Sequence, residues 1–272
     1  MAKTRGKIKL IYILGTAYSG STILGFVLGS AKEIFNAGEI SYLSELNFNI
    51  EKCSCESKVK DCKFWYFLND KFKIYRNSGF LKKTKLILSI LLRLRTSNKP
   101  LAEFNDNDLL DEIRINSKAR YVLDNSKSLW RLMHLMKYPD IDIKVIYIKR
   151  NIQGNVSSYI KHGHSFWKGL FYYKILNYLM YKFINQNKID VIKINYENLC
   201  NNPDTNLKKL GNFLDVRFSD YARRVRETEY HVPTGNLGTR AQKMKDFKGL
   251  KLDDSWEKRL TNFQKIILRI FE

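Results

Sequence analysis

The sequence is short of several residue types that mark specialised classes of protein. Only 4 cysteines, 4 prolines and 14 glycines occur among its 272 residues. So few cysteines exclude a disulfide-rich secreted scaffold, and so little proline and glycine exclude collagen-like and low-complexity chains. Apolar residues make up 44% of the chain, which is enough to form a large core and excludes wholesale disorder.

Long apolar runs are also missing. The best candidate for a membrane span, residues 166–184, contains three lysines, whereas a spanning helix needs about 18 nearly uninterrupted apolar residues. We therefore expect a buried or half-buried helix there. Residues 8–14 are apolar but include Lys9 and end at Gly15, which favours a strand over a signal peptide. The expected location is the cytoplasm, with association at a membrane surface as an option.

Acidic residues are scarce relative to basic ones. The chain has 27 Asp and Glu against 48 Lys and Arg, which gives a formal net charge of +21. Such a charge favours an anionic partner: a phosphate-bearing cofactor, an acidic glycan, nucleic acid or an anionic membrane surface. Residues 82–95 alternate basic and apolar side chains, so this segment could contact a membrane or, as the plainer alternative, pack its apolar stripe on the core.

The pattern of apolar residues predicts an α/β fold. Short stretches rich in β-branched residues predict strands at residues 8–14, 119–123, 143–148 and 190–195. Helical patterns occur at residues 22–30, 80–95, 107–116, 128–137, 156–161, 170–184 and 205–214. The alternation predicts a parallel sheet flanked by helices, in a single domain covering residues 1–272. Residues 36–100 contain no clear strand, and we expect them to form a mainly helical insertion, here called the cap.

Polar residues follow each predicted strand, at residues 15–22, 124–127, 149–158 and 196–197. In open parallel sheets, ligands bind at the carboxyl ends of the strands. The agreement between this rule and the placement of polar residues predicts a ligand site at that edge.

The first polar group is a glycine loop with the Gly-x4-Gly spacing of a phosphate-binding P-loop. Thr22 occupies the Ser/Thr position, but Ser21 stands where the lysine of an NTPase belongs. Backbone N–H groups at such a strand-to-helix turn converge on an anion, whereas the missing lysine argues against an ordinary NTPase. A tight turn without a ligand is the alternative. The candidate binding residues are Tyr18, Ser19, Gly20, Ser21 and Thr22.

This loop, without the NTPase lysine, resembles the 5′-phosphosulfate loop of sulfotransferases, which use 3′-phosphoadenosine 5′-phosphosulfate (PAPS). The likeness implies a P-loop-like α/β fold. Many members have Arg or Lys just before Ser-Gly, where this chain has Tyr18.

Arg150 and, eight residues later, Ser158 resemble the family's 3′-phosphate motif. The resemblance implies that both bind the 3′-phosphate; without the glycine loop, Arg150 would be read as a solvated surface arginine.

Two further motifs carry candidate catalytic residues. Asp124-Asn125-Ser126-Lys127 resembles the Asp-Ser-Ser-Lys segment of many bacterial sulfotransferases, which implies that Lys127 stabilises charge on the bridging oxygen as sulfate leaves. A helix N-cap is the plainer interpretation of this segment.

Glu39, 21 positions after Tyr18, resembles the base in the Gly-Glu pair of tyrosyl-protein sulfotransferases. A helix-start glutamate is the alternative. Rival bases are the four histidines, His134, His162, His164 and His231.

The second half of the chain carries supporting motifs. Tyr196, in a Tyr-Glu-x-Leu segment, resembles a residue near the adenine, although a buried core tyrosine is an equal alternative. Residues 231–240 resemble the family's nucleotide-covering loop, which implies a covering segment at about residues 230–245 with Arg240 closing on the 3′-phosphate.

Three of the cysteines cluster as Cys53, Cys55 and Cys62, followed by Lys63. They resemble a Cys-x-Cys…Cys-Pro-x-Trp segment of bacterial members, with Lys63 in the proline position. Three thiols could bind zinc, but the spacing offers no evident fourth ligand. Free thiols packed in the cap are therefore expected, with a structural metal or a disulfide as the alternative.

Together these motifs predict a PAPS-dependent sulfotransferase that acts without a metal on a hydroxyl acceptor. We expect a carbohydrate or a glycolipid as the acceptor, with peripheral membrane contact as an option, and a peptide tyrosine or small phenol stays open. One alternative is a nucleotide kinase that uses the same loop with ATP. Another is a basic nucleic-acid-binding protein, but the sequence lacks a recognisable nucleic-acid-binding signature, so nucleic acid is not an expected partner.

Overall fold

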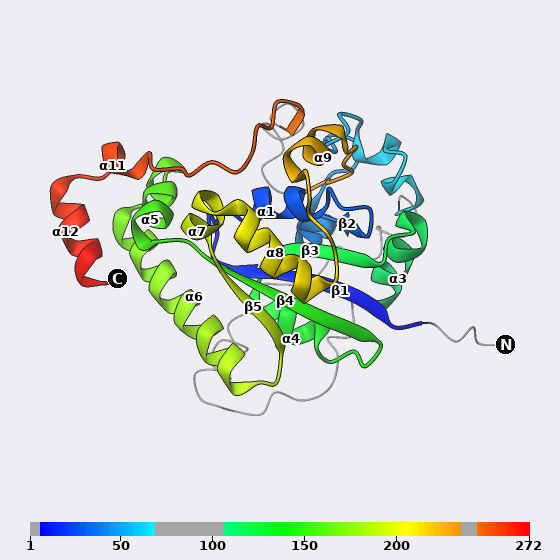
Figure 1. The fold of residues 1–272 in the computed structure, drawn as a ribbon, viewed down its shortest axis with the longest axis horizontal. Coiled ribbons are helices and arrows are strands. Elements are labelled where there is room, and N and C mark those ends of the chain that lie inside the picture. Colours follow the sequence, from blue (N-terminus) through cyan, green and yellow to red (C-terminus); the bar gives the residue numbers. More distant parts are fainter. Residues whose placement is uncertain (1–5, 69–105, 235–243) are drawn as a thin grey trace.

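The computed structural model describes residues 6–68, 106–234 and 244–272. Five parallel strands form one sheet in the order β2-β3-β1-β4-β5 (Figure 1). The strands are β1 (Ile8–Gly15), β2 (Ile34–Asn36), β3 (Tyr121–Lys127), β4 (Ile141–Lys149) and β5 (Asp190–Asn195). The predicted α/β fold with a parallel sheet is therefore confirmed.

Two strands differ from the sequence prediction. Strand β3 does not end at Leu123 but continues to Lys127, with an irregular register against β1 and a positive φ of 62° at Lys127. Strand β2 was not predicted, because its three residues are too few to show an apolar alternation. It pairs in parallel with β3 and adds a fifth strand at the edge of the sheet.

Both faces of the sheet are buried. Along β1, Leu10, Tyr12 and Leu14 pack into the core on one face, while Ile11 and Ile13 pack into the core on the other. A strand covered on both sides needs apolar residues at nearly every position, which explains why β1 reads as a continuous apolar run.

Helices cover the two faces in separate groups (Figure 1). One face packs against α3 (Asp106–Ser117), α4 (Leu129–Leu135) and α6 (Phe166–Gln186). The other packs against α1 (Ser21–Leu28), α7 (Tyr196–Asn201), α8 (Pro203–Leu214) and α9 (Tyr221–Glu227). Helix α5 (Ile152–Lys161) packs on α6. The helices expected at 22–30, 107–116, 128–137, 156–161, 170–184 and 205–214 all occur with shifted ends, whereas the one expected at 80–95 lies outside the described residues.

Helix α6 corresponds to the segment that came nearest to a membrane span. It packs Leu179, Met180 and Ile184 on the sheet, in agreement with the expected half-buried helix. Within the described residues, no helix combines the length and the apolar character that crossing a membrane would require.

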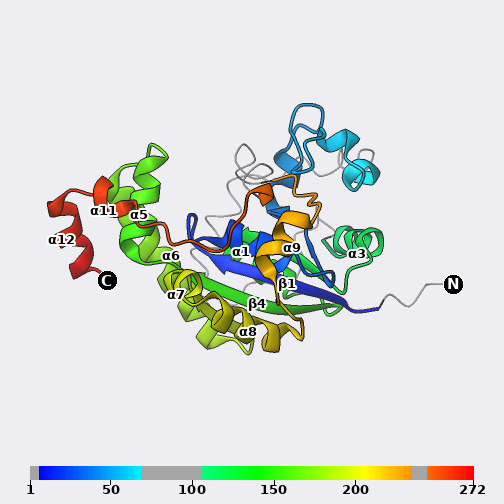
Figure 2. The ribbon, with the colours of Figure 1, turned by 45° about the horizontal axis from the view of Figure 1, so that its top comes forward.

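The segment after β2 and the two C-terminal helices lie at opposite ends of the molecule (Figures 1 and 2). After β2 come three 3₁₀ helices, η1 (Ile40–Glu45), η2 (Val59–Asp61) and η3 (Trp65–Leu68). They anchor in the core through the fully buried Trp65. The C-terminal segment carries α11 (Trp256–Arg259) and α12 (Asn262–Ile270), which pack against α5 through residues that include Leu260 and Leu268.

A buried charge cluster ties β3 to α3 and α4. The Arg131 side chain forms ion pairs with Asp124 (Nε to Oδ2, 2.6 Å) and Asp106 (Nη1 to Oδ1, 2.8 Å), and His134 contacts the other oxygen of Asp106 at 3.1 Å. Burial alone would raise the pKa of Asp106, but the Arg131 charge and His134 hold it below its ordinary value. Removing one member of such a cluster leaves the other charges buried and unpaired.

We predict that Arg131→Ala lowers the free energy of unfolding by about 3–5 kcal/mol, because Asp106 and Asp124 lose their buried partner. The matched control is Arg120→Ala, which removes an exposed ion pair with Asp215 and has little effect. Urea unfolding of both variants checks the prediction. Equal losses in the two variants would contradict this account.

The pKa of Asp106 is lower in the folded protein than in the unfolded chain. The contribution of Asp106 to the stability of the fold is therefore complete above the unfolded-state pKa and is lost as the pH falls toward the folded-state value.

Candidate active site

The expected site residues gather at the carboxyl edge of the sheet. Each of the five strands delivers one group to this edge: Glu39 after β2, Lys127 at the end of β3, the glycine loop after β1, Arg150 after β4 and Tyr196 after β5. The chain leaves the central strand β1 to build β2 and β3 on one side and later returns to build β4 and β5 on the other. The glycine loop therefore lies at the topological switch point, where open α/β sheets bind their ligands.

The glycine loop turns sharply from β1 into α1. Tyr18 and Gly20 adopt left-handed backbone conformations, with φ of 63° and 87°, and α1 begins at Ser21. The Asn155 side-chain amide donates hydrogen bonds to Thr16 Oγ1 (3.0 Å) and to the carbonyl of Ala17 (2.7 Å), which fixes the loop to α5. The loop thus has the strand-to-helix geometry that directs backbone N–H groups toward an anion.

Gly20 is required at its position for two reasons. Its φ is one that residues with a side chain rarely adopt, and a Cβ added there would lie 2.3 Å from Cδ2 of Tyr196. Tyr196 is buried and packs its ring directly on the loop. Burial raises the pKa of Tyr196, which keeps this phenol neutral. The two interpretations of Tyr196 are therefore compatible, since it is a buried tyrosine that also borders the site.

Arg150 and Ser158 lie together beside the glycine loop. Arg150 is buried, and its Nη1 lies 3.4 Å from Ser158 Oγ and 3.3 Å from the carbonyl of Tyr18. Its guanidinium carbon lies 4.8 Å from the centre of the Tyr196 ring. The surface-arginine alternative is wrong, because Arg150 is held between the loop, α5 and Tyr196.

Two buried donors at this edge have no hydrogen-bond partner within the described part of the chain: Ser19 Oγ and Arg150 Nε. Ser19 is fully buried. Buried polar groups in folded proteins are almost always hydrogen-bonded, so orphaned donors on either side of a phosphate-type loop fit an anionic ligand with oxygen atoms at both places.

Asp253 is a site residue that the sequence did not indicate. Its Oδ2 lies 3.1 Å from Arg150 Nη2, and its carbonyl oxygen accepts a second hydrogen bond from the same nitrogen at 2.9 Å. Burial opposes ionisation, but hydrogen bonds from Ser255 and Arg150 hold the pKa of Asp253 below its ordinary value. An acidic residue in a C-terminal segment has no motif to mark it, so only the structure identifies this partner of Arg150.

Tyr18 and His162 form an aromatic pair at the mouth of the loop. Their rings stack with centroids 4.4 Å apart, and Tyr159 meets Tyr18 edge-on at 5.0 Å. Tyr18 therefore contributes a neutral ring where many of the resembling enzymes have a cation. Burial raises its pKa further.

Glu39 and Lys127 form an ion pair on the other side of the loop. Lys127 Nζ lies 2.6 Å from Glu39 Oε1, and both side chains are 15% exposed. The register of β3 places Lys127 beside Leu14, immediately before the glycine loop. The two candidate catalytic residues thus contact each other next to the expected phosphate site.

The backbone around Glu39 is held from two directions. The N–H of Glu39 donates to Thr234 Oγ1 at 2.7 Å, and the N–H of Asn125 donates to the carbonyl of Gly38 at 2.8 Å. Gly38 has a positive φ of 75°, and a Cβ there would lie 2.8 Å from both Thr234 Oγ1 and Val232 Cγ1. Close packing of the 230–234 segment on Gly38 therefore fixes the position of Glu39.

The segment before α4 has a structural role besides its candidate lysine. Asp124 accepts hydrogen bonds from the N–H and hydroxyl of Ser126 and forms the ion pair with Arg131, so it is not a helix cap. The N-cap of α4 is Ser128, which accepts from the N–H of Arg131. The Asn125 amide donates to the carbonyl of Ser21 at 3.0 Å, which links this segment to the first turn of α1.

Some expected residues are placed elsewhere or lie outside the described residues. Arg240 is outside them. His134 is held by Asp106 in the buried charge cluster, and His231 lies beside the cysteines. His231 also supplies what the sequence did not reveal, a fourth potential ligand for the three cysteines, with Nδ1 3.3 Å from Cys62 Sγ.

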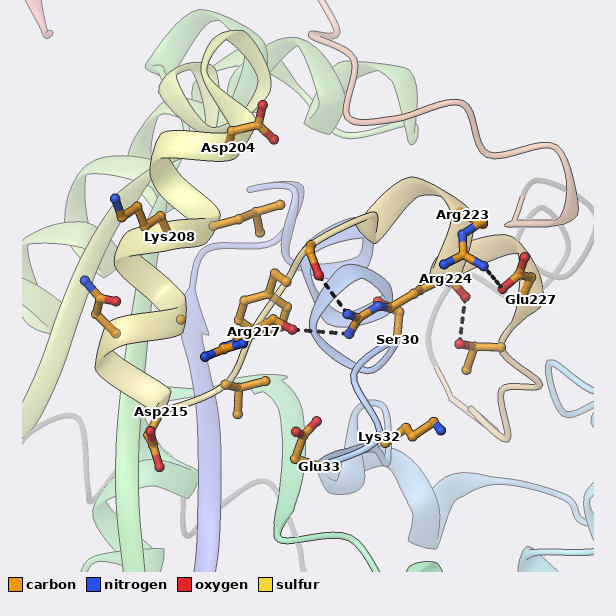
Figure 3. Close-up of a pocket in the computed structure, with 17 residues that line it drawn as sticks. Ser30, Lys32, Glu33, Asp204, Lys208, Asp215, Arg217, Arg223, Arg224 and Glu227 are labelled. Carbon is orange, nitrogen blue, oxygen red and sulfur yellow. Dashed lines mark hydrogen bonds and ion pairs between the residues drawn. The ribbon is translucent and has the colours of Figure 1, made fainter.

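A broad surface hollow of about 1470 Å³ lies away from this edge (Figure 3). It is bordered by α8 and α9 and carries charges of both signs, including Asp204, Lys208, Arg217 and Arg223. Glu33, which lines it, precedes the amino end of β2. None of the expected site residues lines this hollow, so it is separate from the candidate active site.

We predict that Gly20→Ala destabilises the protein more than Gly163→Ala. Both glycines have positive φ, 87° and 81°, so both variants carry a backbone penalty of about 1–2 kcal/mol. Only at Gly20 does the new Cβ meet a ring, which adds about 1–3 kcal/mol; at Gly163 nothing lies within 4 Å. Urea unfolding of the two variants measures the difference. Equal destabilisation would mean that Tyr196 does not pack on the loop as described.

No model of a protein family matches the chain, and no curated protein matches it. Solved structures do resemble it. The sulfotransferase domain of the Synechococcus PCC 7002 olefin synthase has a TM-score of 0.60 at 15% identity, covering 99% of this chain and 96% of that one. The sulfotransferase domain from the curacin biosynthetic pathway has a TM-score of 0.56 at 18% identity, covering 98% of each chain. Over nearly its whole length, the chain therefore has the fold of sulfotransferase domains.

Proposed function

We propose that the chain is a sulfotransferase that moves a sulfuryl group from PAPS to an acceptor hydroxyl and releases 3′-phosphoadenosine 5′-phosphate (PAP). The observation that carries the proposal is the distribution of charge along the carboxyl edge of the sheet. The glycine loop lies at its centre, the buried Arg150 on one side, and the Glu39–Lys127 ion pair on the other. This order suits a donor with a phosphate at one end and a transferable group at the other.

The donor's two anionic ends fit different parts of the edge. The 5′-phosphosulfate would lie on the N–H groups of residues 18–22, where the buried Ser19 hydroxyl lacks a partner within the described chain. The 3′-phosphate would lie on Arg150 and Ser158, with Tyr196 bordering the adenosine side. Asp253 contacts Arg150 in the free protein, so binding exchanges a carboxylate for a phosphate at the same guanidinium.

The Glu39–Lys127 pair supplies the acid–base and electrostatic chemistry. Glu39 accepts the proton of the acceptor hydroxyl. At the same time the oxygen of that hydroxyl forms a bond to sulfur, in line with the departing phosphate oxygen. Lys127 and the loop N–H groups stabilise the negative charge that builds on that phosphate oxygen as the sulfur–oxygen bond breaks. Transfer of this type depends on positioning and charge stabilisation, as in phosphoryl transfer, and these residues need no metal for it.

The acceptor would approach from the β2 side, where Glu39 begins the insertion after Gly38. We propose that residues 36–100 contribute its pocket and that the acceptor is a carbohydrate or glycolipid hydroxyl. The excess of basic residues supports an acidic acceptor or a nearby anionic membrane surface. A peptide tyrosine or a small phenol is the alternative acceptor.

We predict that PAP raises the melting temperature of the wild-type protein more than AMP or Mg²⁺-ATP does. Arg150→Ala should weaken PAP binding roughly 10–150-fold, because a charge-assisted hydrogen bond contributes about 1.5–3 kcal/mol. The control is Arg120→Ala, a surface arginine before β3, which should bind PAP normally. Thermal shift and titration calorimetry measure the effects.

Ser158→Ala is a milder second variant in case Arg150→Ala does not fold, and it should bind PAP more weakly with AMP binding unchanged. If PAP stabilises the wild type no better than AMP, or if Ser158→Ala and Arg150→Ala bind PAP as well as the wild type, the assignment of the 3′-phosphate site fails.

We predict that Glu39→Gln lowers the rate of sulfuryl transfer by about 10²–10⁴-fold and leaves PAP affinity unchanged. PAP release from PAPS is followed with a glycoside, a glycolipid or a phenol as acceptor, after subtraction of the rate without acceptor. The matched control is Glu33→Gln, because Glu33 precedes β2 at its opposite end. A Glu39→Gln protein that binds PAP and retains near-normal transfer would remove Glu39 as the base.

A further inference from the structure

Three cysteines and one histidine form a compact cluster outside the candidate active site. The Sγ of Cys62 lies 3.7 Å from the Sγ atoms of Cys53 and Cys55, and 3.3 Å from Nδ1 of His231. All four potential ligand atoms lie within 4.8 Å of one another. Cys53 and Cys62 are buried, while Cys55 and His231 are half-buried.

Cys62 lies at distances from the other three ligand atoms that are close to those of a tetrahedral metal site. Around zinc, sulfur ligands at about 2.3 Å and nitrogen ligands at about 2.0–2.1 Å are separated from one another by roughly 3.5–3.8 Å. The two sulfur–sulfur distances of 3.7 Å fall within that range, and the sulfur–nitrogen distance of 3.3 Å is close to it. Thiolate and imidazole ligands in tetrahedral arrangement favour zinc over the hard cations, which prefer oxygen.

A disulfide explains the cluster less well. All three cysteines are free, and sulfur–sulfur distances of 3.7 Å exceed the covalent bond length of about 2.05 Å. A disulfide would use only two of the three thiols and would give no reason for His231 to direct Nδ1 at Cys62.

We propose that Cys53, Cys55, Cys62 and His231 bind one structural zinc ion. Four protein ligands close the coordination sphere, which is the arrangement of structural rather than catalytic zinc. Cys55 lines a surface hollow of about 320 Å³, which gives the ion a path to the cluster from solvent.

His231 has contacts through its backbone and places its second ring nitrogen near a carboxylate. Its carbonyl accepts a hydrogen bond from the indole N–H of Trp65 at 2.6 Å, and its ring stacks near Phe64 with centroids 6.1 Å apart. Its second ring nitrogen, Nε2, lies 4.0 Å from Glu229 Oε1. Histidine ligands of zinc commonly direct the other ring nitrogen at a carboxylate, which fixes the tautomer that binds the metal.

The turn that carries the cysteines is also preorganised. The N–H of Cys53 donates to the carbonyl of Ser57 at 2.9 Å, and Glu56 adopts a left-handed φ of 71°. Lys52 and Lys58 form an isolated β-bridge that closes this turn. The backbone therefore brings Cys53 and Cys55 to one side of a tight loop, with Cys62 returning from η2.

Zinc at this place would join two distant parts of the chain. Ser54 already exchanges hydrogen bonds with the opposite segment, through its N–H to the carbonyl of Val232 (3.0 Å) and its hydroxyl to the carbonyl of Tyr230 (2.6 Å). Three residues beyond His231, Thr234 accepts the hydrogen bond from Glu39. The ion would thus secure the segment that positions Glu39, without itself touching the reaction site.

Metal content of the purified full-length protein tests the proposal. After dialysis against EDTA, we expect the wild type to retain about one zinc ion per chain by mass spectrometry. Cys62→Ser and His231→Ala should lose it. Cys200→Ser is the matched control, because Cys200 is the other buried cysteine and lies on α7 away from the cluster, and it should keep its zinc.

Cobalt(II) substitution of the wild type gives a second readout that does not depend on a variant folding. Cobalt should produce the intense visible bands of a tetrahedral site and the ultraviolet charge-transfer band of thiolate ligands. A wild type that retains no zinc and gives no tetrahedral cobalt spectrum would overturn the proposal. So would a disulfide between two of the three cysteines in the freshly purified protein, or full zinc retention by a folded His231→Ala.

Discussion

The parallel arrangement of the five strands is the constraint on which the rest of the structure depends, because it brings every strand end of one polarity to the same edge. Residues far apart in sequence, such as Glu39, Lys127, Arg150 and Tyr196, come together for this reason alone. The central position of β1 puts the glycine loop in the middle of that edge. In the proposed function, the anion-binding residue Arg150 and the acid–base pair Glu39–Lys127 are divided between the strands on either side of β1.

The charges at this edge already have partners in the free protein. Arg150 contacts Asp253, and Lys127 contacts Glu39, so each cation has a carboxylate beside it. A ligand that brings its own phosphates competes with Asp253 for Arg150, and binding is therefore an exchange of anions rather than the burial of an unpaired arginine. The 230–234 segment, linked to the cysteine turn, holds the backbone of Glu39 in place.

Much of this architecture could be predicted from the sequence, and the exceptions have physical reasons. Strand β1 reads as a nearly continuous apolar run because both of its faces are covered, and the glycine loop has a recognisable spacing. The three-residue strand β2 is stabilised by its pairing with β3, a long-range contact that no local pattern records. Asp253 and His231 join their clusters across 103 and 169 positions of the chain, so their roles follow only from tertiary structure. The four residues Asp124–Lys127 were predicted to follow the strand but extend it, because backbone pairing with β1 continues through an irregular register.

The central claim is that one edge of the sheet binds a nucleotide with separate 5′- and 3′-phosphates, and a crystal structure of the protein with bound PAP tests it most directly. The account predicts electron density for the 5′-phosphate on the backbone N–H groups of residues 18–22 and for the 3′-phosphate beside Arg150 and Ser158, with Asp253 displaced from the guanidinium. Density for PAP in the hollow between α8 and α9, or a nucleotide bound at the edge with its 3′-phosphate away from Arg150, would contradict it.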